Sequence, residues 1–379
     1  MRIAYPMRVN ALDTSGGDVL QVQRFIVEGK KPGADGLPRF EGSILSGLAA
    51  DFSSFDLVHL TNIDRPVDTY QSFLAAKAAN KPIVLSPIHH SYEEIERYER
   101  MGRDGLLRSI SGVSGFRQLE YLRSIVRSLA YPELAFPTVR MMLHGMRESQ
   151  REVLTGSDRI LVLADKERED IFRDFGEIPE EKFVQHRNGF EPSAGGVESK
   201  CVRDIDVCMV GRIEARKNQV AVLRVLNRMG ITGVFVGGEN PKHRRYCQRF
   251  RDMIAESKSR HIGQLSHVET LGVMRRARLH ISASWFEVSS MVDLEAYSAG
   301  CGVVSSKCGG TRELLGDAAE YVDPGSEESI QNAIERMLDR VTLEECEGLR
   351  PGAKVPVLAT WSEVGVELAK LYRNAVDAH

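Results

Sequence analysis

Residues 278–300, RLHISASWFEVSSMVDLEAYSAG, join a predicted strand, a loop and a predicted helix without a break. The run RLHISAS (278–284) is short and largely apolar, which is typical of a buried strand. Ser289 or Ser290 can cap the helix that follows, and Gly300 supplies its end. A strand that passes directly into a helix is typical of a parallel α/β sheet with helices on its faces.

Two glutamates stand out in this stretch of apolar and small residues. Glu287 lies in the loop before the predicted helix, and Glu295 lies about a turn and a half inside it. Both carboxylates can therefore face one pocket, where half-buried carboxylates need hydrogen-bond donors. Sugar hydroxyls would supply such donors. The alternative is that Glu295 pairs with an arginine and only closes the helix.

Short apolar runs recur along the whole chain and alternate with segments of helical spacing. The runs cover residues 2–6, 56–62, 81–87, 158–165, 182–186, 206–211, 233–238, 278–284, 302–306 and 320–323. This alternation predicts parallel sheets that are covered by helices on both faces.

The length of 379 residues favours two domains, because a single hydrophobic core stops growing at roughly 250–300 residues. The stretch 188–204 is rich in Gly, Ser and charged residues, and a strand follows it at once. We therefore predict an N-terminal domain at 1–190 and a C-terminal domain at 191–360. The amphipathic segment 361–379 reads as a final helix.

Ligands of such sheets bind outside the carboxyl ends of the strands, and the chain places two informative loops there. In TSGGDVLQVQRFI (14–26), Gly16 and Gly17 open a helix whose N-terminus favours an anion. The alternative for this loop is an ordinary Gly-rich helix start.

In VGRIEARKN (210–218), Arg212 and Lys217 can neutralise a pyrophosphate at the end of a buried strand. The alternative is that these are exposed charges on a turn. We interpret the third cation, Arg216, as a bystander of that exposed kind.

Composition and missing motifs exclude several classes of protein. The formal net charge of -3 gives no electrostatic case for nucleic-acid binding. The six cysteines form no CxxC pair, which argues against a zinc site or a disulfide framework. We find no GxxxxGK(S/T), GxGxxG or GxSxG motif. Without a signal peptide or an apolar run near ~18 residues, a cytoplasmic protein is expected.

The segment 205–325 resembles the family 4 glycosyltransferases, which are retaining enzymes of the GT-B fold. Four motifs carry the resemblance in order: VGRIEARKN, HIGQLSHVETLGVMRRARLHISAS, Glu287-x7-Glu295 with AYSAGCGVV, and CGGTRELLGDAAEYVDP. The first half matches more loosely, at Gly16-Gly17, PIHH and HRNGF. The resemblance implies two doubly wound Rossmann-like domains facing across a cleft, with the C-terminal helix crossing back to the N-domain.

The resemblance also implies roles for residues of the C-terminal domain. Arg212 and Lys217 would hold the diphosphate of the donor, Glu287 would face the donor sugar, and Glu295 would take the ribose hydroxyls. The segment that receives the base would be Gly263, Gln264 and Leu265. Many members of the family have Gly-Phe-Gly after the first glutamate, where this chain has Val288, Ser289 and Ser290. The serine backbone can still donate to a phosphate, but the floor of the sugar pocket is altered.

In the N-terminal domain the resemblance implies that Gly16 and Gly17 close on the phosphates. His90, or less favourably His89, would stand near the reacting centre and the acceptor. The implied reaction is metal-independent transfer, with retention, from a nucleotide-diphosphate sugar to a glycan or lipid-linked acceptor. The expected setting is bacterial cell-surface polysaccharide synthesis (O-antigen, capsule or exopolysaccharide), and no cofactor is expected.

Two alternatives to a transferase remain open from the sequence. One is another GT-B enzyme, such as a nucleotide-sugar epimerase or a phosphorylase. The other is a non-catalytic scaffold that kept the fold. The donor base, the donor sugar and the acceptor are not determined by the sequence.

The region 97–147 carries nine arginines, four acids and no lysine, with apolar residues interleaved. It predicts basic amphipathic helices that can rest on an anionic membrane surface, at the inner face of the cytoplasmic membrane. The alternative is a solvated charged face over the core of the N-domain.

Overall fold

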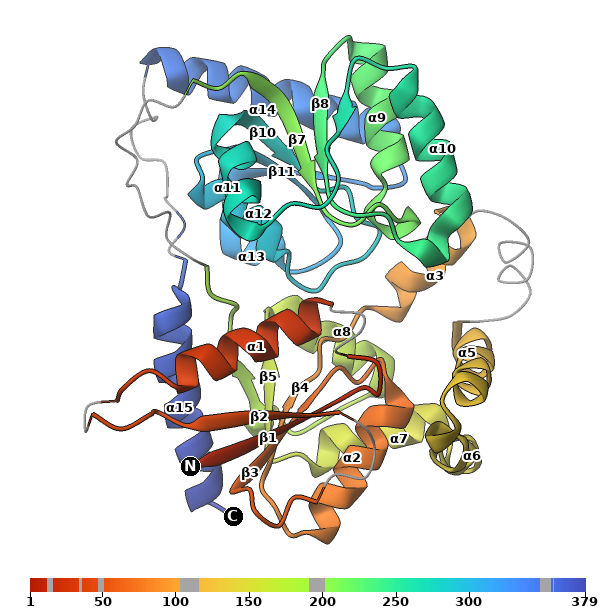
Figure 1. Cartoon of the computed structure of the whole chain (residues 1–379), viewed down its shortest axis with the longest axis vertical. Helices are drawn as coiled ribbons and strands as arrows, with labels where there is room; N and C mark the ends of the chain where they lie inside the picture. The colour runs from red at the N-terminus through yellow and green to blue at the C-terminus, as the bar shows by residue number, and fades with distance from the viewer. Residues whose placement is uncertain are drawn as a thin grey trace. The chain divides into compact units, whose positions relative to one another are not determined.

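The computed structural model describes residues 1–11, 16–33, 36–46, 51–102, 116–190, 202–347, 356 and 358–379, with the backbone alone at 116–119 and 344–347. Contacts divide the described chain into two units (Figure 1). Unit 1 comprises the described residues of 1–92, 114–189 and 359–379. Unit 2 comprises those of 93–113 and 190–358.

Unit 1 is built on a six-stranded parallel sheet of order β2-β1-β3-β4-β5-β6. Its strands are β1 (Arg2–Met7), β2 (Glu41–Ser46), β3 (Leu57–Thr61), β4 (Ile83–Ser86), β5 (Arg159–Val162) and β6 (Phe183–Gln185). Its helices are α1 (Gly17–Gly29), α2 (Pro66–Ala78), α5 (Phe116–Ala130), α6 (Ala135–His144), α7 (Met146–Gly156), α8 (Asp165–Phe175) and α15 (Trp361–Asp377), with 3₁₀ turns η1 (Pro132–Leu134) and η2 (Glu180–Lys182).

Unit 2 is built on a second six-stranded parallel sheet, of order β12-β11-β10-β7-β8-β9. Its strands are β7 (Ile205–Val210), β8 (Gly233–Val236), β9 (Arg260–His261), β10 (Ala277–Ile281), β11 (Gly302–Ser306) and β12 (Ala319–Val322). Its helices are α3 (Tyr92–Met101), α9 (Gln219–Met229), α10 (Arg244–Ala255), α11 (His267–Arg276), α12 (Met291–Ser298), α13 (Thr311–Leu315) and α14 (Glu327–Glu347), with 3₁₀ turns η3 (Ala215–Lys217), η4 (Pro241–His243) and η5 (Gly316–Ala318).

The prediction of an α/β fold with parallel sheets is confirmed, because a strand overlaps every predicted apolar run. Strands β3, β4 and β8 are buried along their whole length, which is why they read as continuous apolar runs. The prediction missed β2 and β9. The sequence of β2, EGSILS, alternates between exposed and half-buried positions at the edge of the sheet. The strand β9 has only two residues.

Helix α3 packs on unit 2, although it follows β4 in the chain. Its Tyr98 ring lies 5.5 Å from the Phe286 ring and 6.4 Å from the Trp285 ring. Its Arg97 makes an ion pair with Asp323 at 2.5 Å. An aromatic contact and a charge therefore tie α3 to the loops that follow β10 and β12.

Helix α15 packs on unit 1 through a buried face of Trp361, Val364, Leu368 and Tyr372. Thr360 and Glu363 form a capping box at its start. The hydroxyl of Tyr372 lies 2.8 Å from that of Tyr5 on β1 and 2.6 Å from His59 Nδ1 on β3. Burial lowers the pKa of His59 to about 3, so this ring is neutral inside the core.

Candidate functional site

The sheet of unit 2 reverses its winding at β7, which has β8 on one side and β10 on the other. In doubly wound sheets the ligand crevice lies outside the carboxyl ends of the two strands at such a switch point. The loops that leave β7 and β10 at this edge are residues 211–218 and 282–290. They carry Lys217 and Glu287, and the amide N–H of Trp285 donates to the carbonyl of Arg216 at 2.9 Å.

Lys217 and Glu287 form the ion pair that joins these two loops. Lys217 Nζ lies 2.7 Å from Glu287 Oε2, and each side chain is 17% exposed. Lys217 ends the short turn η3, and Asn218 continues the chain with φ 66, a left-handed conformation that asparagine tolerates. The structure therefore brings these two predicted site residues together at the switch point.

Arg216 is the third member of the cluster, and its interpretation as an exposed bystander is wrong. Its side chain is 20% exposed, and its Nη1 lies 3.2 Å from Glu287 Oε2. The same nitrogen donates to the Phe286 carbonyl, and the guanidinium also binds Glu214 at 3.2 Å. Burial alone would lower the pKa of Arg216, but Glu287 and Glu214 raise it above its usual value. No local sequence pattern distinguished the buried Arg216 from the exposed Arg212. The turn η3, which directs Arg216 toward Glu287, makes the difference.

Arg212 is placed differently from the other two cations. Its side chain is 48% exposed, and its Nε lies 3.8 Å from Glu214 Oε2. Although burial opposes the shift, Arg216 and Arg212 lower the pKa of the Glu214 carboxyl. The role of Arg212 in holding a diphosphate stays a prediction.

Gly309 and Gly310 lie against the loop that carries Glu287. The Gly310 N–H donates to the Val288 carbonyl at 2.7 Å. Gly309 has φ 110, and a Cβ there would lie 2.5 Å from the Glu287 carbonyl oxygen. Gly310 is the N-cap of α13.

Ser290 caps α12, because its side chain accepts from the Asp293 N–H. Asp293 is fully buried and binds Ser305 Oγ at 2.6 Å and His280 Nε2 at 3.2 Å. The hydroxyl of Ser289 is buried and has no hydrogen-bond partner in the part of the chain that the structure describes. The loop after β10 is therefore anchored at its end, while Ser289 retains an unused polar group beside Glu287.

Among the described residues, Glu295 pairs with a histidine and with no arginine. Its Oε1 lies 2.9 Å from Nε2 of His267, and the glutamate side chain is 21% exposed. His267 opens α11 behind the capping box of Ser266 and Glu269. His267 was not predicted from the sequence, although it lies within the motif HIGQLSHVETLGVMRRARLHISAS.

The segment Gly263, Gln264 and Leu265 lies beside the end of β8. The Gly263 carbonyl accepts from the Gly237 N–H at 2.7 Å, and Gln264 Oε1 accepts from the Gly238 N–H at 3.1 Å. Side chains are excluded here, because a Cβ on Gly237 would lie 2.2 Å from the Gly211 carbonyl oxygen. The predicted base segment is thus held by backbone groups next to the loop that carries the cations.

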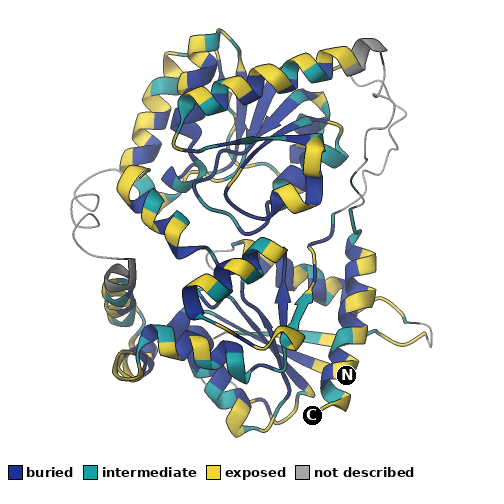
Figure 2. Cartoon of the chain, turned by 180° about the vertical axis from the view of Figure 1, so that it is seen from behind, coloured by how far each residue is buried: buried dark blue, intermediate teal, exposed yellow. Residues whose placement is uncertain are grey.

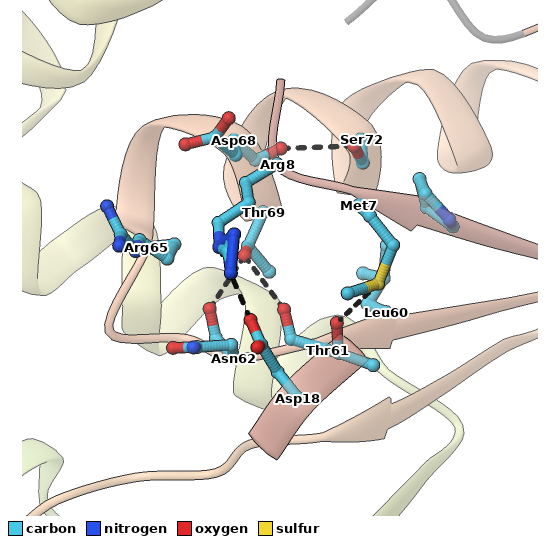
Figure 3. Close-up of a pocket in the computed structure, with 11 residues that line it drawn as sticks. Met7, Arg8, Asp18, Leu60, Thr61, Asn62, Arg65, Asp68, Thr69 and Ser72 are labelled. Carbon is cyan, nitrogen blue, oxygen red and sulfur yellow. Dashed lines mark hydrogen bonds and ion pairs between the residues drawn. The ribbon is translucent and has the colours of Figure 1, made fainter. Parts of the chain in front are cut away.

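Unit 1 has its own switch point, between β1 and β3, and a small pocket lies there (Figure 3). Arg8 Nε lies 3.5 Å from Asp18 Oδ2, and both side chains are 9% exposed. Gly16 is the N-cap of α1 in an extended conformation, and Gly17 begins the helix with nothing within 4 Å of the position that a Cβ would take. Asp18 places a negative charge in the first turn of this helix.

The histidine doublet after β4 divides into one buried and one half-exposed side chain. His89 Nδ1 lies 2.7 Å from Asp64 and its Nε2 lies 2.8 Å from Asp174, with the side chain 0% exposed. Burial alone would lower the pKa of His89, but the two aspartates raise it to about 10. His90 is 21% exposed, and its Nδ1 lies 3.0 Å from the other oxygen of Asp64.

The backbone before the doublet is strained. Ile88 has φ 46, and a left-handed conformation of a β-branched residue costs on the order of 1–3 kcal/mol. Such strain clusters at functional sites, where the surrounding structure enforces it. Because both ring nitrogens of His89 bind aspartates, His90 is the better candidate of the two for contact with a ligand. Its catalytic role stays a prediction.

The described residues contain no candidate metal centre and no candidate membrane span. Within them, no three His, Cys, Asp or Glu side chains lie together in a way that could hold a metal ion. Within the same part of the chain, no helix has the length and apolar character that a membrane crossing needs.

Comparison with known proteins points to one family for unit 2. Residues 198–354 match the family model described as glycosyl transferases group 1. No curated protein sequence matches the chain.

Solved structures match the whole chain. Sucrose-phosphate synthase from Thermosynechococcus elongatus matches with a TM-score of 0.70 at 14% identity, over 100% of both chains. HepE from Anabaena, in complex with UDP, matches with a TM-score of 0.62 at 14% identity, over 100% of this chain and 98% of the other. The lipopolysaccharide outer core galactosyltransferase WaaB, without ligand, matches at 0.58 and 14% identity, over 100% and 99%.

At these identities the likeness concerns the fold. It agrees with the two six-stranded parallel sheets and with the switch points described above. The chain has the GT-B fold of two Rossmann-like units, and its second unit matches the glycosyl transferases group 1 model.

Proposed function

We propose that the chain is a retaining glycosyltransferase that moves a sugar from a nucleotide-diphosphate sugar to a glycan or lipid-linked acceptor. The single observation that carries the proposal is the cluster of Lys217, Arg216 and Glu287 at the switch point of unit 2. The match of residues 198–354 to the group 1 model supports it. So does the likeness to HepE, whose structures contain UDP, UDP with glucose, or UDP-glucose.

The cations of this cluster serve the leaving group. When the bond between the sugar C1 and the diphosphate breaks, negative charge develops on the diphosphate oxygens. Fixed cations aimed at developing charge commonly make the largest single contribution to the rate enhancement of an enzyme. Lys217 and Arg216 supply two such charges without a metal ion, and the more exposed Arg212 adds a third at the rim of the cluster.

Glu287 has two successive partners in this proposal. Without donor, both cations bind its Oε2. When a diphosphate takes over Lys217 and Arg216, the carboxylate is released to accept hydrogen bonds from the sugar hydroxyls. Ser289, whose buried hydroxyl has no partner among the described residues, lies in the same loop as Ser290. Its hydroxyl and the backbone of Ser290 complete the donor contacts.

The remaining residues of the proposed site bind the nucleoside and phosphates of the donor or serve the reacting centre. Glu295, now bound to His267, accepts the ribose hydroxyls, and the backbone of Gly263–Leu265 receives the base. In unit 1, Gly16 and Gly17 approach the phosphates, and His90, oriented by Asp64, serves the reacting centre. The acceptor hydroxyl forms the new bond to C1 on the face the diphosphate leaves, and its proton goes to the departing phosphate oxygen.

The acceptor belongs to cell-surface glycan assembly on the cytoplasmic side of a bacterial membrane, in this proposal. The likeness to WaaB, a lipopolysaccharide outer core galactosyltransferase, supports that setting. No observation favours an epimerase, a phosphorylase or a scaffold over a transferase.

The test begins with a thermal-shift panel of UDP, GDP, ADP and their sugars. A ligand at about 100 times its dissociation constant stabilises the fold by ~2.7 kcal/mol. The nucleotide that binds identifies the donor, and NMR of the product gives the anomeric configuration. No shift with any nucleotide contradicts the proposal, and release of a free epimerised sugar favours an epimerase instead.

A further inference from the structure

Helix α3 has one buried side and one exposed side (Figure 2). Its buried residues Ile95, Tyr98 and Glu99 are spaced by three and four, so they lie on the same side of the helix. Tyr98 is 5% exposed and belongs to the hydrophobic core cluster of unit 2 that also contains Trp285. A helix that follows a strand of unit 1 in the chain therefore contributes a side chain to the core of unit 2.

Tyr98 contacts the two aromatic residues that precede Glu287 in the loop after β10. Its ring centroid lies 5.5 Å from that of Phe286, with an interplanar angle of 70° that is typical of edge-to-face packing. The Trp285 ring lies 6.4 Å from the Tyr98 ring. Aromatic pairs in this range attract each other beyond the effect of the area that they bury. The Tyr98 ring therefore restrains the segment of the loop that leads to Glu287.

Arg97 and Gly102 add contacts to the same segment. The Arg97 guanidinium lies 5.8 Å from the centre of the Trp285 ring and makes an ion pair with Asp323. A Cβ on Gly102 would lie 2.6 Å from Trp285 Nε1 and 2.7 Å from Tyr98 Cδ2. The residue after α3 therefore approaches both rings as closely as only a glycine can. Three positions at the end of α3 thus hold Trp285 in place.

The same segment is bonded to a cation of the proposed donor site. The Trp285 N–H donates to the Arg216 carbonyl at 2.9 Å, and Arg216 Nη1 donates to the Phe286 carbonyl at 3.2 Å. The Arg216 guanidinium also lies 5.3 Å from the centre of the Phe286 ring. Phe286 therefore contacts Tyr98 of α3 and Arg216 of η3 at once, and Glu287 is the next residue in the chain.

We propose that Tyr98 is a positioning residue of the transferase, which acts through Phe286 to hold the Glu287 carboxylate where the donor sugar binds. This inference rests on the proposed function and deepens it. It assigns the support of a donor-site carboxylate to a helix that lies outside the loops of the site itself.

The need for this support arises when the donor binds. Both ion pairs that now fix the Glu287 carboxylate, with Lys217 and Arg216, are given up when the diphosphate takes over these cations. The position of Glu287 then depends on the backbone of its own loop, which the contacts of α3 restrain. Misplacement of a group that orients the substrate by about 1 Å can lower the rate roughly 10²-fold.

The test compares three variants of the full chain with the wild type. Tyr98→Ala removes the ring that contacts the loop, and Tyr98→Phe keeps it. Phe250→Leu is the matched control, because it removes a ring from the same core cluster of unit 2 at a residue that is 0% exposed. The Phe250 ring packs on those of Phe235 and His261, at 5.2 Å and 5.4 Å. This control therefore weakens the core of unit 2 at a different place.

The first measurement is hydrogen exchange of the loop without ligand, followed by mass spectrometry. Tyr98→Ala should raise the exchange rate of peptides that cover residues 285–288 roughly tenfold, because the loop opens locally more often. Tyr98→Phe and Phe250→Leu should exchange in these peptides like the wild type.

The second measurement separates the sugar from the nucleotide. Calorimetric titration uses UDP and UDP-glucose, or the corresponding pair for the base that the thermal-shift panel identifies. In Tyr98→Ala the affinity for the nucleotide sugar should fall roughly tenfold relative to that for the free diphosphate, as for one hydrogen bond to a charged group. Its kcat should fall roughly 10–100-fold. The affinity for the free diphosphate should change little, since Lys217 lies in η3, where its N–H donates to the Glu214 carbonyl at 2.9 Å.

The outcomes distinguish the positioning role from the proposed function. Wild-type transfer with equal kcat and equal loop exchange in Tyr98→Ala overturns the positioning role alone. The same holds if Phe250→Leu changes the loop and kcat as much as Tyr98→Ala does, or if Tyr98→Phe is as impaired as Tyr98→Ala. If the wild type binds no nucleotide, the proposed function is contradicted, and the role of Tyr98 in transfer is rejected with it even where loop exchange rises.

Discussion

Two charge clusters, one in each unit, stand in loops that leave a strand at the carboxyl edge of a parallel sheet. In unit 1, His89 lies between Asp64 and Asp174, and its side chain is 0% exposed. In unit 2, Glu287 and Lys217 bind each other, and each remains 17% exposed. Both are short ion pairs of similar geometry. The difference in exposure separates a cluster that holds its loop from one that a ligand can reach.

The largest expected effect comes from breaking the cluster of His89, Asp64 and Asp174 in unit 1, which we call the closed cluster. His89→Gln leaves the buried Asp174 and the partly buried Asp64 without the cation between them, and breaking a buried pair in this way costs about 3–5 kcal/mol. Urea unfolding of the variant and the wild type measures the difference. His144→Gln, at a side chain 44% exposed, is the control and should change stability by less than ~1 kcal/mol. A change below ~1 kcal/mol for His89→Gln would show that the two clusters do not differ in this way.

We call the cluster of Lys217, Arg216 and Glu287 in unit 2 the open cluster. A substitution in it should change the rate of sugar transfer rather than the stability of the fold. Lys217→Ala should lower the rate of sugar transfer by ~10²–10³, because a charge aimed at the leaving diphosphate is lost. Its stability should change little, since Arg216 still binds Glu287 at 3.2 Å. Steady-state kinetics and urea unfolding are the two measurements. Arg224→Ala, an exposed cation on α9, is the control for charge and should retain full activity.

The support of the open cluster can be tested at Gly309. Gly309→Ala forces a Cβ to 2.5 Å from the Glu287 carbonyl oxygen at φ 110, so the loop must shift. Backbone strain of this kind costs on the order of 1–3 kcal/mol. We expect kcat/KM to fall by the factor that corresponds to a free energy of this size. Gly272→Ala on α11 meets nothing within 4 Å and should leave the activity unchanged. Equal activity in both variants would show that Gly309 is not needed to hold the loop of Glu287 in its active position.

Ribose recognition should have a smaller effect. If Glu295 accepts the ribose hydroxyls, Glu295→Ala should weaken binding of the ribonucleotide roughly tenfold, as for one hydrogen bond to a charged group. The wild type should prefer the ribonucleotide to its 2′-deoxy analogue, and the variant should lose that preference. Calorimetric titration of both nucleotides makes the comparison. An unchanged preference in the variant would remove Glu295 from the donor site.

The closed cluster also predicts a direction of pH dependence. The folded pKa of His89 is about 10 against an ordinary 6.5, so its stabilisation is complete below pH 6.5 and is lost as pH rises toward 10. The Glu167 carboxylate accepts a hydrogen bond from the His89 N–H at 2.8 Å, and burial raises its pKa to about 7, which adds a loss of stability as pH rises from 4.5 to 7. Although burial opposes the shift, His89 and His90 lower the pKa of Asp64. The stabilisation that the ionised Asp64 provides is therefore lost only in strong acid. Urea midpoints from pH 5 to 10 should fall in the wild type and less in His89→Gln.

The sequence was sufficient for elements whose pattern is local. Buried parallel strands are continuous apolar runs. Ser290 is the N-cap of α12, and Gly300, with φ 83, follows the C-cap of the same helix. It was not sufficient for β2, whose half-exposed edge has no apolar run. Residue types and spacing also identified Lys217, Glu287 and Glu295 as candidates before any contact was known.

What failed depended on the direction and depth of side chains. Arg212 and Arg216 look alike in VGRIEARKN, yet the turn η3 buries Arg216 against Glu287 and leaves Arg212 48% exposed. The two histidines of PIHH are equivalent in sequence, and only the distant Asp64 and Asp174 distinguish them. Such contacts between remote segments have no local signal.

The attachment of α15 has a consequence for how the chain is made. Tyr372 completes a buried hydrogen-bonded group with Tyr5 and His59, so the core of unit 1 depends on both early and late residues. Domains generally fold as their residues leave the ribosome, the N-terminal one first. Here the described residues of unit 2 end at 358, before α15 begins. Unit 2 can therefore finish folding before α15 is synthesised, and the surface of β1 and β3 in unit 1 is covered only after the described residues of unit 2 have been made.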